Sequence, residues 1–220
     1  MIELLSEPLR QSTMFQNHLD KEQNGVCVVK YAVGALVLDA SGDVLMCTHR
    51  ERGGEFSNGA IGFVTETLKY QKNTDGITLG ITESPIHALK RCFREELDLD
   101  VTSLETEQLH FDRQNPAFFS EWEFINDDGV HISYPIVNMV MRTEDPELFM
   151  LPSEGTLELD STMFAPPNPA MLEHMNTRPG AISWLRRMLR FESQPVEKNV
   201  IIEVDWGSKQ LVSDIDARMV

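Results

Sequence analysis

Cysteine is scarce in this chain, and its spacing forms no motif. The 220 residues include three cysteines, Cys27, Cys47 and Cys92, and no CxxC pair. An odd number of scattered cysteines excludes a disulfide framework and a zinc site built on CxxC motifs. It is typical of proteins in a reducing compartment.

Long apolar runs are also absent. No stretch approaches the roughly 20 residues that a membrane-spanning helix needs, and the N-terminal residues MIELLSEPLRQSTMFQ lack the basic and then apolar pattern of a secretory signal. Together with the cysteine content, these two absences predict a cytoplasmic protein without a membrane partner.

Basic residues are outnumbered by acidic ones. The chain has 19 Lys and Arg against 35 Asp and Glu, which gives a formal net charge of -16. Such a charge repels polyanions, so DNA, RNA and anionic membrane surfaces are disfavoured as partners. A small anionic substrate remains compatible with this charge if a metal ion or a local basic patch reverses its sign at the site.

The organisation that the sequence does show is that of one sizeable domain with an extension at each end. Residues 1–24 form a polar N-terminal arm, residues 25–192 the domain, and residues 193–220 a C-terminal extension. The arm could pair two copies of the chain, so a homodimer is kept as an open alternative.

Alternating and β-branched residues predict mostly strands within the domain. Two β-hairpins are expected, with turns at residues 41–43 and 128–129. A short strand is expected at 60–64, and the polar residues 68–82 predict a loop or lid. A second helix near Pro179 and a late strand in NVIIEVDW complete an α+β fold with a mixed sheet.

The stretch SPIHALKRCFREELDLD, residues 84–100, predicts an amphipathic helix. Ser84 suits the N-cap position, and Pro85 suits the first turn, where its missing N–H costs nothing. On a helical wheel one apolar stripe emerges, which we expect to pack on the sheet. The stripe consists of Ile86, Leu89, Phe93 and Leu97.

Beside this stripe lie Glu95 and Glu96, on the same flank as Cys92 and Ala88. Arg91 stands four residues before Glu95 and can pair with it. Carboxylate oxygens are the ligands that Mg²⁺ prefers, usually one or two of them with water and substrate phosphates. An adjacent pair of glutamates on a helix more often forms part of a solvated surface, so this pattern alone does not establish a metal site.

At these spacings the segment resembles the Nudix box, Gly-x5-Glu-x7-Arg-Glu-U-x-Glu-Glu-x-Gly-U, where U is a bulky apolar residue. Six residues match at the required spacing: Glu83, Arg91, Phe93, Glu95, Glu96 and Leu99. The preceding hairpin and the stretch IGFVTE are similar to the strands that open Nudix domains. The resemblance covers roughly residues 30–145 and implies a Nudix-like α/β/α sandwich with a mixed central β-sheet.

Three departures from the box bear on function. Its first glycine is missing from the usual place, and Gly62 is the better counterpart, so residues 68–82 are an insertion. Asp98 replaces the second glycine, which is tolerable because Asp accepts a left-handed conformation. Cys92 replaces the first glutamate of the Arg-Glu pair, and a thiol is a poor ligand for Mg²⁺.

The resemblance implies hydrolysis of a nucleoside diphosphate linked to another moiety, with Mg²⁺ or Mn²⁺ as cofactor. It makes Glu95, Glu96 and Arg91 the catalytic residues. The metal ligands that it implies are Glu83, Glu95, Glu96 and the carbonyl of Gly62.

Residues outside the box are less well defined. Nudix branches with a base on a later loop make Glu154 and Glu158 candidate general bases. Arg50 and Arg52 end a predicted strand, where they can meet substrate phosphates, although a solvated surface explains them equally well.

Other functions remain open at this point. Cys92 favours a catalytically impaired Nudix-like domain that binds a nucleotide or a protein partner. An isomerase of the isopentenyl-diphosphate type is disfavoured because Cys47 lacks the motif that surrounds the reactive cysteine in that branch. The net charge disfavours a nucleic-acid-binding module.

Overall fold

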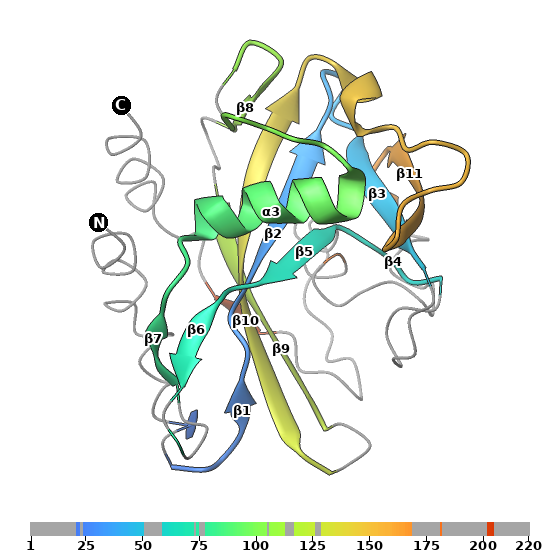
Figure 1. Cartoon of the computed structure of the whole chain (residues 1–220). Coiled ribbons are helices and arrows are strands. Elements are labelled where there is room, and N and C mark those ends of the chain that lie inside the picture. The colour runs from blue at the N-terminus through green and yellow to red at the C-terminus, as the bar shows by residue number, and fades with distance from the viewer. Residues whose placement is uncertain are drawn as a thin grey trace.

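The computed structural model describes residues 21–22, 24–50, 59–72, 74, 78–104, 106–112, 117–125, 129–168, 181 and 202–204. Within these ranges a ten-stranded mixed β-sheet carries helix α3 (Pro85–Leu97) on one face (Figure 1). Its strands in chain order are β1 (Val28–Val29), β2 (Ala32–Leu38), β3 (Val44–His49), β4 (Ile61–Gly62), β5 (Val64–Thr67), β8 (Leu109–Phe111), β9 (Ala117–Ile125), β10 (His131–Thr143), β11 (Leu159–Ala165) and β12 (Ile202–Val204).

The main path through this sheet is β11-β3-β2-β10-β9-β12. Strands β2 and β10 run parallel, whereas β9 pairs with β10 and β11 pairs with β3 in antiparallel fashion. The prediction of an α+β fold with a mixed central sheet is therefore confirmed.

Both predicted hairpins are present. The β2–β3 turn is closed by Asp39, whose carboxylate Oδ1 accepts hydrogen bonds from the backbone N–H of Ser41 and Asp43 at 2.8 and 2.9 Å. Gly42 has φ +85° in this turn, and Gly129 has φ +76° between β9 and β10. Glycine adopts this left-handed conformation without a Cβ penalty.

Two strand predictions need correction. The strand expected at residues 60–64 is divided into β4, which pairs with β3, and β5, which pairs with β2. The expected loop at 68–82 instead contains a separate hairpin of β6 (Tyr70–Lys72) and β7 (Thr78–Ile81). The sequence of this segment lacks the alternation of apolar and polar residues that marks a half-buried strand, so the strand pair was not predicted.

Helix α3 begins and ends as its sequence predicts. The Ser84 hydroxyl accepts a hydrogen bond from His87 N–H at 3.2 Å, and Pro85 occupies the first turn. At the other end Asp98 adopts φ 54° and ψ 30°, the left-handed conformation in which its N–H closes the last turn onto the carbonyl of Phe93. Asp98 thus takes the role expected of the missing glycine.

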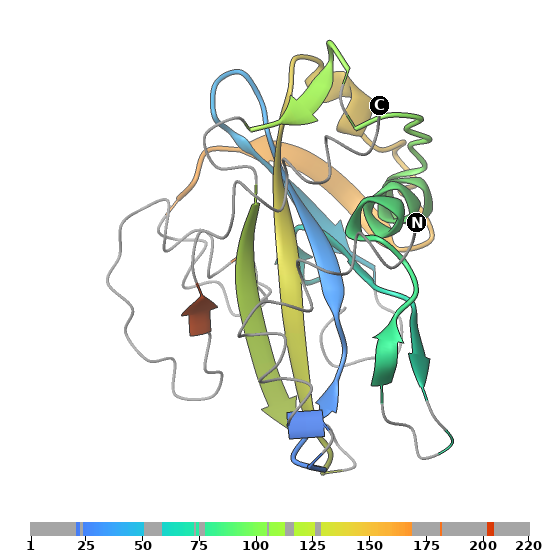
Figure 2. The same cartoon turned by 90° about the vertical axis from the view of Figure 1, so that its left-hand side faces the viewer.

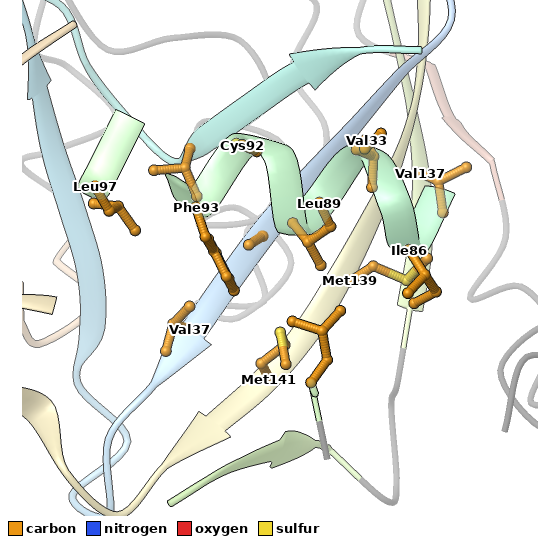
Figure 3. Packing of buried hydrophobic residues seen from close by; sticks show 14 of the residues in the cluster. Val33, Val37, Ile86, Leu89, Cys92, Phe93, Leu97, Val137, Met139 and Met141 are labelled. Carbon is orange, nitrogen blue, oxygen red and sulfur yellow. The ribbon is translucent and has the colours of Figure 1, made fainter. Parts of the chain in front are cut away.

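The apolar stripe of α3 is buried against the sheet (Figure 3). Figure 2, turned by 90°, shows α3 nearly end-on at one side of the sheet. Burial of a large apolar side chain contributes about 1.5–3 kcal/mol, so the stripe fixes the helix in place. Phe93 also meets Phe149, the last residue of the 3₁₀ helix η1 (Pro146–Phe149), edge to face at 5.9 Å between ring centroids.

The opposite face of the sheet is covered as well. Val33, Ala35 and Val37 of β2 belong to the cluster under α3, whereas Leu36 and Leu38 belong to a second buried cluster. That second cluster includes Ala181, the one described residue of the helix predicted near Pro179. A sheet that is buried on both faces is what the α/β/α layering requires.

The C-terminal segment contributes β12, which pairs with β9 and so confirms the late strand. The three-part division of the chain remains a prediction, because most of residues 1–24 and 193–220 lies outside the described residues. Among the helices that the structure describes, none is long and apolar enough to cross a membrane.

Candidate functional site

Arg91 lies near the middle of α3, and its side chain contacts two other residues that match the box, Glu83 and Glu95. Its guanidinium binds Glu83 in a bidentate pair, from Nε to Oε1 at 3.1 Å and from Nη2 to Oε2 at 2.8 Å. Nη2 also donates to the backbone carbonyl of Thr67 at the end of β5, at 2.9 Å. Arg91 therefore connects the helix, the residue before the helix and the adjacent strand.

This pair changes the acidity of both partners. Burial by itself raises the pKa of the Glu83 carboxyl, but hydrogen bonds from Arg91 and from Lys69 N–H outweigh it, so the pKa lies below its ordinary value. The hydrogen bond with Glu83 raises the pKa of Arg91. Both oxygens of Glu83 accept hydrogen bonds from the protein, which identifies this residue first as an anchor for Arg91.

A glutamate that sequence reasoning missed also contacts Arg91. Glu66 of β5 places Oε2 at 2.8 Å from Nη1, and Glu95 lies on the same Nη1 at 3.6 Å. The predicted pairing of Arg91 with Glu95 is therefore present. The signal for Glu66 was its position two residues after Val64 on β5, because alternate residues of a strand lie on one face of the sheet.

Position 92 lies in a different environment. The Cys92 side chain is fully buried in the cluster under α3, and this cluster also contains Cys47 of β3. Cys47 is the cross-strand partner of Gly62 in β4. Burial raises the pKa of the Cys92 thiol well above its ordinary value, and the negative charges of Glu96 and Glu66 raise it further. Cys92 is a neutral core residue in this structure and touches no solvent.

The two adjacent glutamates of the box are exposed to different degrees. The side chain of Glu95 is 45% exposed, whereas Glu96 is 4% exposed and lies on the buried side of α3. The backbone carbonyl of Glu96 accepts a hydrogen bond from the Thr156 hydroxyl at 2.7 Å. Thr156 thereby ties the loop that carries Glu154 and Glu158 to the C-terminal turn of the helix.

Arg50 holds the other side of this loop. Its side chain donates to Asp160 Oδ1 at 2.8 Å and to the carbonyl of Glu154 at 2.5 Å, and its backbone N–H donates to the carbonyl of Glu158 at 2.8 Å. The structure thus brings Arg50, both candidate bases and the end of α3 together. Contact of Arg50 with a substrate remains a prediction, and Arg52 lies outside the described residues.

The carboxylates of α3 are the candidate ligands for a divalent cation. Glu95 and Glu96 supply carboxylate oxygens of the kind that Mg²⁺ prefers. Arg91 is one positive charge that faces the carboxylates of Glu66, Glu83 and Glu95. Across the described ranges, no three His, Cys, Asp or Glu side chains are arranged to hold a metal ion. The residues fit a cation held by one or two carboxylates together with substrate phosphates, and they do not form a closed cage of protein ligands.

No protein-family model matches the sequence, and no curated protein matches it. Among solved structures, the chain is similar to the MutT protein of Methanosarcina mazei Go1, with 11% identity over 74% of this chain and 95% of that chain and a TM-score of 0.44.

Two further solved structures are similar at the same level. The Nudix hydrolase RenU of M. smegmatis is 14% identical over 74% of this chain and 84% of that chain, with a TM-score of 0.39. The Nudix domain of Shewanella oneidensis NrtR, solved with ADP-ribose, is 10% identical over 74% and 87%, with a TM-score of 0.42. At these low values neither substrate nor mechanism carries over from those proteins.

Proposed function

We propose that this protein is a Nudix-type pyrophosphohydrolase, which cleaves the diphosphate of a nucleoside diphosphate linked to another moiety. The observation that supports this most directly is the ion-pair cluster around Arg91. Glu83 and Glu95, which match the box by spacing alone, both contact this one guanidinium. A solvated helix face does not require a bidentate pair with a residue that precedes the helix.

In this proposal Glu95 and Glu96 hold Mg²⁺ or Mn²⁺, and the carbonyl of Gly62 is a further oxygen donor. When bound, the cation neutralises the diphosphate charge and polarises the phosphorus under attack. Arg91 acts on its neighbours, because Glu83, Thr67 and Glu66 already accept its hydrogen bonds. We therefore assign Arg91 and Glu83 to positioning the carboxylates.

The general base has to come from outside position 92, since a buried neutral thiol does not activate water. Glu154 and Glu158 are the candidates that we propose. Their loop is held at one side by Arg50 and at the other by the hydrogen bond from Thr156 to Glu96. This arrangement keeps an acidic loop beside the end of the helix that carries the proposed ligands.

The test is hydrolysis by the purified full chain in the presence of Mg²⁺ or Mn²⁺. The panel contains ADP-ribose, NADH, diadenosine polyphosphates, nucleotide sugars and nucleoside triphosphates. We expect turnover of one class that is lost in Glu96→Gln and kept in Glu107→Gln, which neutralises an exposed glutamate elsewhere on the chain. Equal turnover by Glu96→Gln and the wild type contradicts the proposed ligand role.

The second candidate function is a Nudix-like domain that binds a nucleotide without cleaving it. The fully buried Cys92 favours it, because the family's carboxylate at this position is replaced by a group with no access to substrate. This alternative predicts that a nucleotide from the panel raises the melting temperature while no product forms. A ligand that binds only the folded state stabilises it by an amount that grows with the logarithm of the ligand concentration relative to Kd.

A further inference from the structure

Strand β5 brings to the site Glu66, at a position where the box specifies no residue type. Val64 and Glu66 are alternate residues of β5, and Val64 belongs to the buried cluster under α3. Val33, which lies opposite Glu66 on β2, belongs to the same cluster. Because alternate residues and cross-strand partners share a face, Glu66 projects from the face of the sheet that α3 covers.

The Glu66 carboxylate is held in one orientation. Oε1 accepts a hydrogen bond from Thr67 N–H at 2.8 Å, and Oε2 lies 2.8 Å from Nη1 of Arg91. Glu95 reaches the same nitrogen at 3.6 Å, and its side chain is 45% exposed against 20% for Glu66. The carboxylates of Glu66 and Glu95 thus share the nitrogen Nη1 of Arg91, and Glu66 is the closer and more buried of the two.

We infer that Glu66 is a positioning residue, which acts through Arg91 on Glu95. This inference rests on the proposed function of the site. With Nη1 occupied by Glu66, the Glu95 carboxylate is kept from closing onto the guanidinium and stays free to ligate a divalent cation. Without the charge of Glu66, Arg91 pairs fully with Glu95 and competes with the cation for its oxygens.

The first experiment measures Mn²⁺ affinity of the full chain directly, from the electron paramagnetic resonance signal of free Mn²⁺. Wild type, Glu66→Gln and the control Glu107→Gln are compared, and their melting temperatures are recorded. We expect Glu66→Gln to bind Mn²⁺ roughly tenfold more weakly, the size of effect typical for residues that orient metal ligands. Unchanged affinity in Glu66→Gln overturns the inference, whatever its melting temperature.

The second experiment separates this inference from the proposed function. Urea unfolding of Glu66→Gln, Glu95→Gln and the double variant forms a double-mutant cycle. Because the two residues share Nη1, we expect the loss from Glu95→Gln to grow in the Glu66→Gln background, by about threefold or more in the unfolding equilibrium constant. Additive losses overturn the inference.

A wild type that neither binds Mn²⁺ nor hydrolyses any compound of the panel removes the proposed function. In that case a non-additive cycle still supports Glu66 as the residue that positions Glu95, and an additive cycle overturns it. Failure of the proposed function is thus seen in binding and hydrolysis, whereas failure of the inference is seen in the stability cycle.

Discussion

Arg91 and Cys92 are neighbours in the chain, yet they lie in opposite environments. Arg91 is at the centre of a polar cluster in which Glu83, Glu66 and Glu95 contact one guanidinium. Cys92, rotated by 100° around the helix, is fully buried among apolar side chains. Arg91 makes ion pairs with the helix, the segment before it and β5, whereas the adjacent position belongs to the core.

This contrast explains why a thiol at position 92 is compatible with the contacts of Arg91. The bidentate Arg91–Glu83 pair does not depend on the side chain at position 92, because it links the helix to residues outside it. A thiol suits a fully buried site in the cluster that also contains Cys47, since it behaves as a small hydrophobe. The two positions are thus separable, and variants at each test the separation.

The largest effect is expected from Cys92→Glu. A carboxylate at this fully buried position, near Glu96 and Glu66, is expected to cost about 3–5 kcal/mol of unfolding free energy at neutral pH. Burial raises the pKa of the introduced carboxyl in the folded state, so the loss grows as the pH rises above the pKa in the unfolded chain. Urea unfolding at pH 5 and pH 8 measures it, with Cys92→Ala as the control that only removes the thiol. An equal loss for both variants at pH 8 would show that position 92 accepts a charge.

Arg91→Met is expected to have the next largest effect. Methionine keeps much of the volume but leaves Glu83 and Glu66 without their shared cation, at a site where the Arg91 side chain is 14% exposed. We expect a loss of about 2–3 kcal/mol of unfolding free energy. This is less than for a fully buried ion pair, because the partners retain some contact with solvent. Arg91→Lys should restore only part of it, since lysine cannot form the bidentate pair. Full stability of Arg91→Lys in urea unfolding would argue that the paired geometry is unimportant.

A smaller effect with a defined pH dependence is expected from Glu83→Gln. The pKa of Glu83 is lowered in the folded state, so its contribution is present above the pKa of the unfolded chain and is lost as the pH falls through the folded value. We expect Glu83→Gln to cost about 1–2 kcal/mol at pH 7, and the difference from wild type to shrink below about pH 4. Melting temperatures of both proteins from pH 3 to pH 7 test this. A difference that stays constant with pH would place the stabilisation elsewhere.

The parts of this fold that could be predicted are those with local signals. Ser84, Pro85 and the stripe of α3 fixed the helix, and the glycines of the two turns fixed the hairpins. Strands β6 and β7 were missed, because their residues carry turn and polar signals without the alternation that marks a half-buried strand.

The site was predicted only as far as spacing along one helix allows. The Arg91–Glu95 pair follows from helical geometry, whereas Glu83 lies before the helix and its pairing with Arg91 was not predicted. The role of Glu66 depends on the register of β5 against β2, which no local pattern contains. The same holds for Arg50, whose partners Asp160 and Glu154 lie more than 100 positions later in the chain. Contacts between distant segments are set by the folded topology, so sequence reasoning placed these residues without their partners.

The smallest effect is expected at the connection between the helix and the acidic loop. Thr156→Val keeps the shape of the side chain and removes the hydroxyl that donates to the Glu96 carbonyl and accepts from the N–H groups of Glu158 and Leu159. We expect a loss of about 1 kcal/mol, with faster amide hydrogen exchange confined to residues 153–159. Thr156→Ser keeps the hydroxyl and should exchange like wild type. Because Glu96 is on the buried side of α3 beside Cys92, loosening this contact should leave the Arg91 cluster unchanged. Faster exchange around Glu83 and Arg91 in Thr156→Val would mean that the two environments are coupled after all.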